Sequence, residues 1–119
     1  IQEDDNDCRL LFETRLTANN EWILDAFINT GGKGYVLFVE SKRHPIGPWY
    51  HVAIVVGGGM FRSYTNGEKE AESAITFGPL KEGRTSIGVR MNLLSWFKGA
   101  MRSARFSPSA LKPENFSGS

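Results

Sequence analysis

Short apolar segments separated by turn residues dominate this sequence, and no long stretch has the spacing of an amphipathic helix. No run of about 12 residues keeps apolar side chains at i, i+3, i+4 and i+7 without an interrupting Gly or Pro. Segments of β-favouring residues recur instead at intervals of about 8–12 residues, as in antiparallel sandwiches. A parallel α/β sheet is disfavoured because its strands need crossover helices. We expect an antiparallel β-sandwich, with a small closed barrel as the structural alternative.

The turn residues predict where the strands end. Asn29–Gly34 contains three glycines, Gly57–Gly59 follows an apolar run, and Asn66–Gly67 is a two-residue hairpin signal. Between these turns we expect strands at Arg9–Leu16, Trp22–Ile28, Tyr35–Glu40, Trp49–Val56, Met60–Thr65, Ala74–Phe77, Thr85–Arg90 and Phe97–Phe106.

Three of these segments carry more specific expectations. Trp49–Val56 is apolar on both faces, so we expect a central strand buried on both sides, with Trp49 capping the core and His51 a core histidine. Glu68–Ser73 is polar and is expected to be exposed. Ser109–Leu111 predicts a short helical turn near the end of the chain.

Composition limits the classes of protein to consider. A chain of 119 residues with 40% hydrophobic and 23% charged residues is expected to form one folded domain, residues 1–119. The net charge of +1 excludes a strongly basic nucleic-acid-binding protein, and no apolar run is long enough for a membrane span. Cys8 is the only cysteine, so an intrachain disulfide is impossible. Basic residues are enriched over 81–112, which predicts either a surface for phosphate, sulfate or uronate groups or solvated strand faces.

The sequence does not predict catalysis. A glycosidase needs two facing carboxyl groups, whereas the strands that carry acids have one each, at Glu13, Asp25 and Glu40. Cys8, His44 and His51 have no spacing typical of a nucleophile–base pair or of metal ligands. We therefore expect a protein without enzymatic activity.

Acidic residues predict two further features. Asp25 lies inside an apolar strand, so an inward-facing carboxylate there needs a partner, and Arg15 and Arg62 are the candidates. The loop at 4–7 offers hard oxygen ligands for Ca²⁺ at Asp4, Asp5 and Asp7. A solvated acidic turn is the alternative, since the loop lacks the Gly and distal Glu of an EF-hand.

Residues 49–67, WYHVAIVVGGGMFRSYTNG, resemble the Trp-x-His-Val-Ala … Tyr-x-Asn-Gly signature of laminin G-like domains, members of the concanavalin A-like lectin/glucanase superfamily. The later TSIGVR, WFKGAMRSARF and SALKPENF resemble that family's Ile-Gly strand, Phe-x-Gly strand and Ala-Leu-x-Pro ending. The match is good over residues 49–116 and loose over 9–40. The resemblance implies an antiparallel sandwich of the jelly-roll type.

The same resemblance implies a function. It favours a non-catalytic carbohydrate-binding, lectin-like module of a larger extracellular or cell-envelope protein, with a glycan or polysaccharide as partner and Ca²⁺ as a candidate ion. A structural, protein–protein interaction or oligomerisation domain is one alternative, and a fragment of a glycoside hydrolase-like protein is another. Aromatic platforms with polar groups nearby are the expected ligand-binding residues, namely Trp22, Asp25, Arg90, Asn92 and Trp96.

Length is the last expectation from the sequence. Laminin G-like domains usually run longer than this chain, so we expect the first strands of the sandwich to be absent or supplied by another chain. An open sheet edge would then remain, and such an edge favours pairing with a second copy or with a partner strand.

Overall fold

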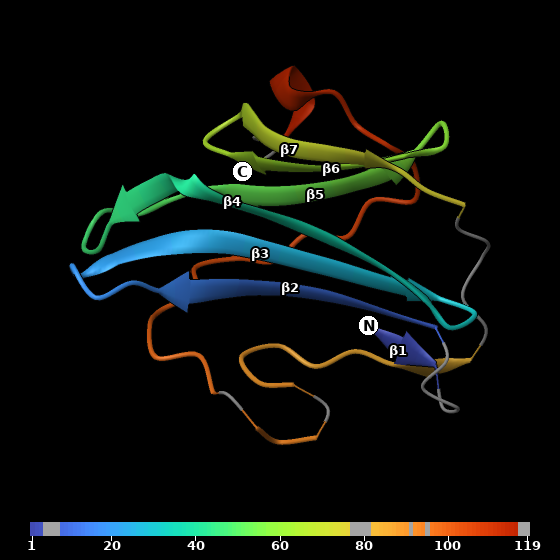
Figure 1. The fold of residues 1–119 in the computed structure, drawn as a ribbon, viewed down its shortest axis with the longest axis horizontal. Helices are drawn as coiled ribbons and strands as arrows, with labels where there is room; N and C mark the ends of the chain where they lie inside the picture. The colour runs from blue at the N-terminus through green and yellow to red at the C-terminus, as the bar shows by residue number, and fades with distance from the viewer. Residues whose placement is uncertain (4–7, 77–81, 91, 95, 117–119) are drawn as a thin grey trace.

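The computed structural model describes residues 1–3, 8–76, 82–90, 92–94 and 96–116, and it is an antiparallel β-sandwich, as the sequence predicts (Figure 1). A single turn of 3₁₀ helix lies near the end, at Pro113–Asn115. The strands are β1 (Gln2–Glu3), β2 (Cys8–Leu16), β3 (Glu21–Thr30), β4 (Lys33–Pro45), β5 (Val52–Gly57), β6 (Met60–Thr65), β7 (Glu68–Ala74) and β8 (Gly83–Arg84).

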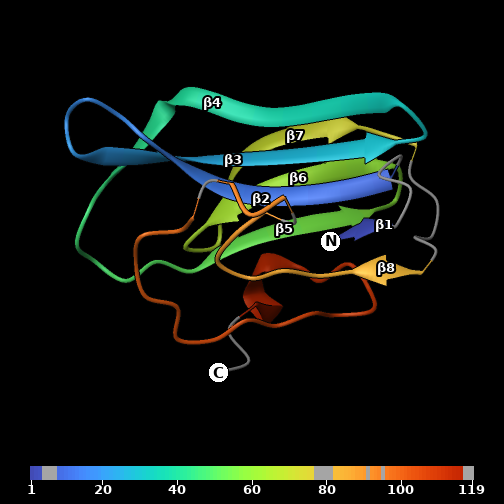
Figure 2. The ribbon, with the colours of Figure 1, turned by 90° about the horizontal axis from the view of Figure 1, so that it is seen from below.

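The strands form two sheets that pack face to face (Figures 1 and 2). One sheet has five strands in the order β4-β3-β2-β1-β8, of which β1 and β8 are two residues each. The other has three strands in the order β5-β6-β7. Every pairing is antiparallel, as expected where successive strands are joined by tight turns.

The core lies between the two sheets. Strand β3 contributes Ala26 and Ile28, strand β4 contributes Leu37, and strand β6 contributes Phe61. Ile28 and Phe61 are completely buried. Burying a side chain of this size stabilises the fold by about 1.5–3 kcal/mol, so the contact between β3 and β6 is a main source of stability.

Two glycine-containing turns set the register of the three-stranded sheet. Gly58 and Gly59 join β5 to β6 with φ angles of 59° and 74°, and Asn66 and Gly67 join β6 to β7 with φ angles of 50° and 79°. Two consecutive positive φ angles define the hairpin turn that matches strand twist. The hairpin predicted from Asn66-Gly67 is confirmed.

Strand β5 is an edge strand, so the expectation of a central strand is wrong. Among the described residues it pairs with β6 alone. Trp49 and His51, which precede it, are exposed rather than part of the core, and Trp49 is 58% exposed. The apolar outer face of β5 is covered instead by the end of the chain, where the Ala110 methyl lies against Gly57.

The later strands also differ from expectation. The polar segment Glu68–Ala74 is strand β7, because its backbone pairs with β6 while its polar side chains stay largely exposed. The separate strand expected over Ala74–Phe77 is not found, since β7 ends at Ala74 and residues 75 and 76 are not in a strand, while residue 77 lies outside the described residues. Residues 85–90 and 97–106 are not strands. The turn of 3₁₀ helix lies at Pro113–Asn115, after the predicted Ser109–Leu111, where proline at the first position suits a helix start.

Within the described residues, the structure contains no helix with the length and apolar character needed to cross a membrane.

Candidate functional site

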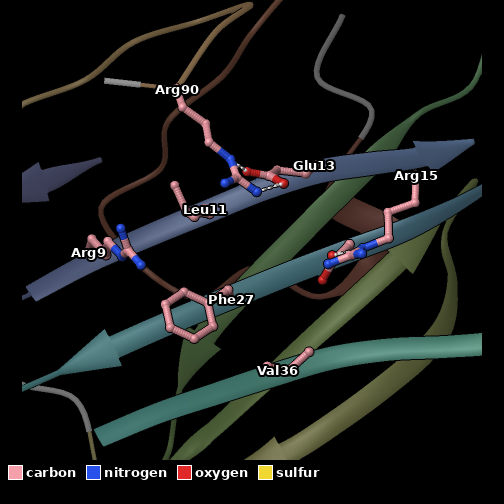
Figure 3. A pocket seen from close by; sticks show the side chains of 8 residues that line it. Arg9, Leu11, Glu13, Arg15, Phe27, Val36 and Arg90 are labelled. Carbon is pink, nitrogen blue, oxygen red and sulfur yellow. Dashed lines mark hydrogen bonds and ion pairs between the residues drawn. The ribbon is translucent and has the colours of Figure 1, made fainter. Parts of the chain in front are cut away.

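A pocket opens on the outer face of the five-stranded sheet, away from the core (Figure 3). Its volume is about 200 Å³. Charged and apolar side chains line it together, and they are Arg9, Leu11, Glu13, Arg15, Asp25, Phe27, Val36 and Arg90. We call this site the arginine pocket.

The alternation of side chains along a strand explains why these residues meet. Alternate residues of β2, from Arg9 to Arg15, point to the outer face, since the residues between them pair with core positions of β3. On β3, Asp25 and Phe27 lie opposite Glu13 and Leu11 in the register. The pocket is therefore specified by a period of two in the sequence together with the β2–β3 register.

Arg90 comes from the connection after β8 and reaches across to β2 (Figure 3). Its Nε and a terminal guanidinium nitrogen both donate hydrogen bonds to the carboxylate of Glu13, the second at 2.6 Å from Glu13 Oε2. These hydrogen bonds raise the pKa of Arg90 above its usual value, against the opposing effect of partial burial. A two-point contact of this kind fixes the orientation of the guanidinium relative to the carboxylate. It therefore holds the connection that carries Arg90 against β2.

The buried carboxylate of Asp25 has an arginine partner, as its position in an apolar strand requires. Asp25 is 6% exposed, and Arg15 Nε donates a hydrogen bond to it. Of the two partners considered from the sequence, Arg15 is the one observed. The Arg15 guanidinium also lies over the Phe38 ring, 5.4 Å from its centroid. The ring contact therefore helps to fix the position of the Arg15 side chain beside Asp25.

Arg9 differs from the other two arginines of the pocket. Its guanidinium lies 5.3 Å from the centroid of the Phe27 ring. Its Nε is buried and has no hydrogen-bond partner in the described part of the chain. A buried donor without a partner is uncommon and costs about 1–3 kcal/mol. Arg9 is therefore the arginine of the pocket that neither Glu13 nor Asp25 binds.

Two carboxylates are neighbours in the pocket, which the sequence analysis missed. Glu13 on β2 and Asp25 on β3 are direct register partners, and such neighbours have Cβ atoms about 4.5–5.5 Å apart. No single strand carries two acids, but the pairing of β2 with β3 brings two carboxylates together, so the prediction that no two acids face each other is wrong. Both carboxylates, however, are bound by arginines.

The five ligand-binding residues expected from the sequence lie in different places. Asp25 and Arg90 line the arginine pocket. Trp22 lies on the inner face with 8% of its surface exposed, against the rings of His44 and Tyr50. The remaining two are on the connection that carries Arg90, at Asn92 and Trp96.

Neither of those two residues lines the pocket. The Asn92 side chain accepts a hydrogen bond from the backbone N–H of Leu94, at 3.0 Å. Trp96 is 65% exposed. Its ring is open to solvent, and the tether between Arg90 and Glu13 holds the same connection near β2.

The calcium expectation falls on Asp4, Asp5 and Asp7, which lie outside the described residues. Elsewhere, in the part of the chain that the structure describes, no group of three or more His, Cys, Asp or Glu side chains could hold a metal ion.

Six pocket residues were not among the expected ligand-binding residues, although Arg15 was named as a candidate partner of Asp25: Arg9, Leu11, Glu13, Arg15, Phe27 and Val36. One signal was present: in Arg9–Leu16 the charged residues occupy alternate positions, at Arg9, Glu13 and Arg15, with Leu11 between them. Phe27 lies beside these residues because β3 pairs with β2. Arg90 lies beside them through its contact with Glu13, which is 77 residues away in sequence.

Comparison with known proteins defines the class. A laminin G-type family model described as the Concanavalin A-like lectin/glucanases superfamily matches residues 2–116. The chain belongs to this superfamily, whose fold is the jelly-roll sandwich that the two sheets form.

One solved structure resembles the chain in fold. It is a crystal structure of an S-layer domain-containing protein from Clostridium thermocellum ATCC 27405, with 18% sequence identity and a TM-score of 0.55. The match covers 98% of this chain and 64% of that one, so the chain spans less than two thirds of its length. A search of curated proteins found no match.

Proposed function

We propose that this domain binds carbohydrate without catalysis, and that the arginine pocket binds an acidic sugar. The observation that carries the proposal is Arg9, whose buried Nε has no partner in the described chain and whose guanidinium lies over Phe27. Membership of a superfamily that includes lectins supports the choice of carbohydrate.

The charge of the pocket favours an acidic ligand. Three arginines and two carboxylates line it, which leaves one positive charge in excess. Glu13 and Asp25 each neutralise one arginine, so Arg9 carries the excess. A uronate carboxylate or a sulfate group is the anion that a planar guanidinium binds at two points.

The apolar part of the pocket suits a sugar ring. Leu11, Phe27 and Val36 lie beside the charged groups, and an aromatic face packs against the C–H face of a pyranose. Glu13 and Asp25 offer acceptor oxygens for hydroxyl groups. The pocket thus combines the apolar contact and the few oriented polar groups typical of small-ligand sites.

Binding without turnover follows from the state of the two carboxylates. A retaining glycosidase needs one carboxylate as nucleophile and one carboxylic acid as proton donor, about 5–5.5 Å apart. Glu13 and Asp25 are register partners on neighbouring strands, but Arg90 and Arg15 bind their carboxylates. The proposal is therefore a lectin-like module rather than a glucanase.

Calorimetric titration with oligogalacturonate tests the proposal, with neutral oligosaccharides as the comparison. Arg9→Ala should weaken binding about ten- to hundredfold, since a hydrogen bond to a charged group contributes about 1.5–3 kcal/mol. Arg43→Ala is the matched control, because Arg43 is an arginine of β4 that pairs with Glu40 outside the pocket.

Two results would overturn the proposal. Equal affinity of the native protein and Arg9→Ala for oligogalacturonate would remove the pocket as the binding site. Release of reducing ends from a polysaccharide, lost in Glu13→Gln, would make the domain a glycosidase.

We also propose that the domain belongs to an extracellular or cell-envelope protein. The similar fold in an S-layer domain-containing protein supports this location, as does the superfamily. Antibodies against the domain should label intact cells of the source organism. Labelling only after permeabilisation would contradict the proposal.

A further inference from the structure

We propose that strand β4 pairs with β4 of a second copy of this chain, so that two five-stranded sheets join edge to edge. β4 is the outermost strand of its sheet, and among the described residues it pairs with β3 alone. Figure 2 shows β4 at the margin of the sandwich, with no other described segment beyond it. The edge is therefore accessible to a strand from outside the chain.

The turn before β4 determines which of its backbone groups face outward. Glycines 31 and 32 form a two-residue turn with positive φ angles of 60° and 88°, and Thr30 pairs with Lys33 across it. Such a turn closes on a hydrogen-bonded pair, and hydrogen-bonded and non-hydrogen-bonded pairs alternate from there. The backbone groups that point away from β3, toward the free edge, are therefore those of Gly34, Val36 and Phe38. Within the described residues, no backbone hydrogen bond from outside the β3–β4 pairing reaches them.

The two halves of β4 differ in their protection against pairing. In the second half the register with β3 shifts after Phe38, and the segment beyond it carries Glu40, Lys42 and Arg43. Bulges and charges of this kind prevent edge-to-edge association in natural sheets. The first half, over residues 34–38, has neither a register shift nor a charge. Its regular, uncharged edge is the kind that pairs with another strand.

Residues 34–38 are complementary to themselves in an antiparallel pairing centred on Val36. Val36 then lies opposite Val36 of the second copy, and Phe38 lies opposite Gly34 of the second copy. The outward backbone groups form about six hydrogen bonds in this register, two in each pair. Val36 and Phe38 are 60% and 40% exposed, and the pairing covers both. The Phe27 ring packs over Gly34, 3.0 Å from where a Cβ would be, and it offers Phe38 of the second copy an apolar surface.

Charges at the two ends of the pairing favour a second copy over an unrelated strand. In an antiparallel pairing the start of one strand lies beside the end of the other, so Lys33 comes near Glu40 of the second copy at both ends. Both residues are exposed, and Glu40 has a 3.4 Å contact with Arg43 that solvent weakens. An interface one strand wide buries less than about 1,200 Å², the size of weak and transient complexes. We therefore expect a dimer that dissociates on dilution.

The dimer would put two arginine pockets on one continuous outer face. Val36 lines the pocket of its own chain, so Val36 of the second copy lies beside the rim of that pocket. With neighbouring strands about 4.8 Å apart, the two β2 strands are separated by about 24 Å. A polysaccharide that reaches both pockets would bind with higher avidity than a short oligosaccharide. This consequence rests on the proposed function, whereas the dimer itself does not.

Opposite charges at position 36 test the pairing, because Val36 meets its own copy at the twofold axis. Sedimentation velocity of the native protein should show a monomer–dimer equilibrium between about 10 µM and 1 mM. Val36→Lys and Val36→Glu should each weaken dimerisation about tenfold or more, since like charges then meet at the axis. An equal mixture of the two variants should recover a heterodimer. These measurements contain no sugar, so their failure is distinguishable from failure to bind oligogalacturonate.

Leu16→Lys is the matched control, because Leu16 is an exposed apolar residue of β2, which β3 separates from the β4 edge. It should leave dimerisation unchanged. An equal loss in Leu16→Lys and Val36→Lys would overturn the proposal. A native protein that stays monomeric at about 1 mM would do the same. So would a mixture of the two Val36 variants that stays monomeric although circular dichroism shows that both are folded.

Amide hydrogen exchange identifies the edge that pairs. The outward amides of Gly34, Val36 and Phe38 should exchange about tenfold slower in concentrated than in dilute protein. The amides of Tyr35 and Leu37, which face β3, should not respond to concentration. Protection that rises with concentration at β5 instead would make β5 the interface and would overturn the proposal.

Discussion

β3 and β5 are both rich in apolar residues, yet they hold different positions in the fold. β3 is paired on both sides, and its residues from Trp22 to Ala26 are all buried. β5 is paired on one side only, and Val55 is its one buried residue. The comparison shows that an apolar pattern reports how many faces of a strand are covered, and does not report how many of its edges are paired.

The outer faces of the two sheets differ in a similar way. Beside β3, the outer face carries the arginine pocket, where charged side chains pair with one another. Beside β5, the outer face is covered by the end of the chain, with Ala110 on Gly57 and Phe116 on Tyr64. The sheet with an open outer face is therefore the one that offers a polar site.

The largest expected effect compares the two strands directly. Ile28→Ala on β3 should reduce the free energy of unfolding by about 2–5 kcal/mol, because Ile28 is completely buried. Ile54→Ala on β5 should cost about 1–2 kcal/mol, since Ile54 is only partly buried against the core. Urea denaturation measures both, and equal losses would contradict the difference between the strands.

The next effect tests the cover over β5. A Cβ added at Gly57 would lie 2.7 Å from the Cβ of Ala110, so Gly57→Ala should destabilise the protein by about 1–3 kcal/mol through overpacking. Ala110→Gly in the same chain removes the clash and should restore most of the loss, after correction for the single Ala110→Gly variant. Additive losses in this double-mutant cycle would mean that the two residues do not touch in solution.

A smaller effect concerns the buried carboxylate of β3. Arg15→Ala leaves Asp25 buried without its guanidinium partner and should cost about 1–2 kcal/mol, between the values for exposed and buried pairs, since Arg15 is itself largely exposed. The exposed pair of Arg43 with Glu40 is the matched control, and Arg43→Ala should change stability by about 0.5 kcal/mol or less. A loss no larger than that of the control would remove the structural role of the pair.

The smallest effect is the pH response of the outer face of β6 and β7. Hydrogen bonds from Lys69 and Arg62 lower the pKa of Glu72 below its ordinary value of 4.5. A lowered pKa means that the contribution of Glu72 to stability is present above pH 4.5 and is lost as the pH falls through the pKa in the folded protein. In the Glu72→Gln variant, the midpoint of thermal unfolding should therefore fall slightly less between neutral and acid pH than in the native protein. At neutral pH the midpoint of the variant should be only slightly lower than that of the native protein. A larger acid sensitivity in the variant would reverse the sign.

Much of the fold could be predicted from local sequence. The segments around β2, β3, β4 and β6 and the Asn66-Gly67 turn are where the pattern puts them, because alternation and turn residues act over a few positions. β7 was missed because a polar edge strand carries little apolar signal. Residues 97–106 have a strand-like sequence but no partner to pair with in the described chain, and a strand exists only in a sheet.

The candidate site was predicted only in part. Asp25 was identified because a carboxylate in an apolar strand needs a partner, and Arg90 because it is a polar group shortly before the aromatic platform Trp96. Trp22 was expected on a ligand surface but is packed in the interior. The residues next to it in sequence do not distinguish an exposed tryptophan from a buried one. The pairing of Arg90 with Glu13 joins residues that no local pattern relates.

The sequence by itself determined the class of this protein: an antiparallel jelly-roll sandwich of the concanavalin A-like lectin/glucanase superfamily, with a buried Asp25 that must be paired. Its local patterns encode side-chain alternation and turn geometry, which depend on neighbouring residues only. Tertiary structure decided which edges are paired and which side chains meet across strands. The arginine pocket depends on these long-range contacts, as does the place of β5 beside β6 alone in the described sheet, and the proposed binding of carbohydrate follows from the first of them.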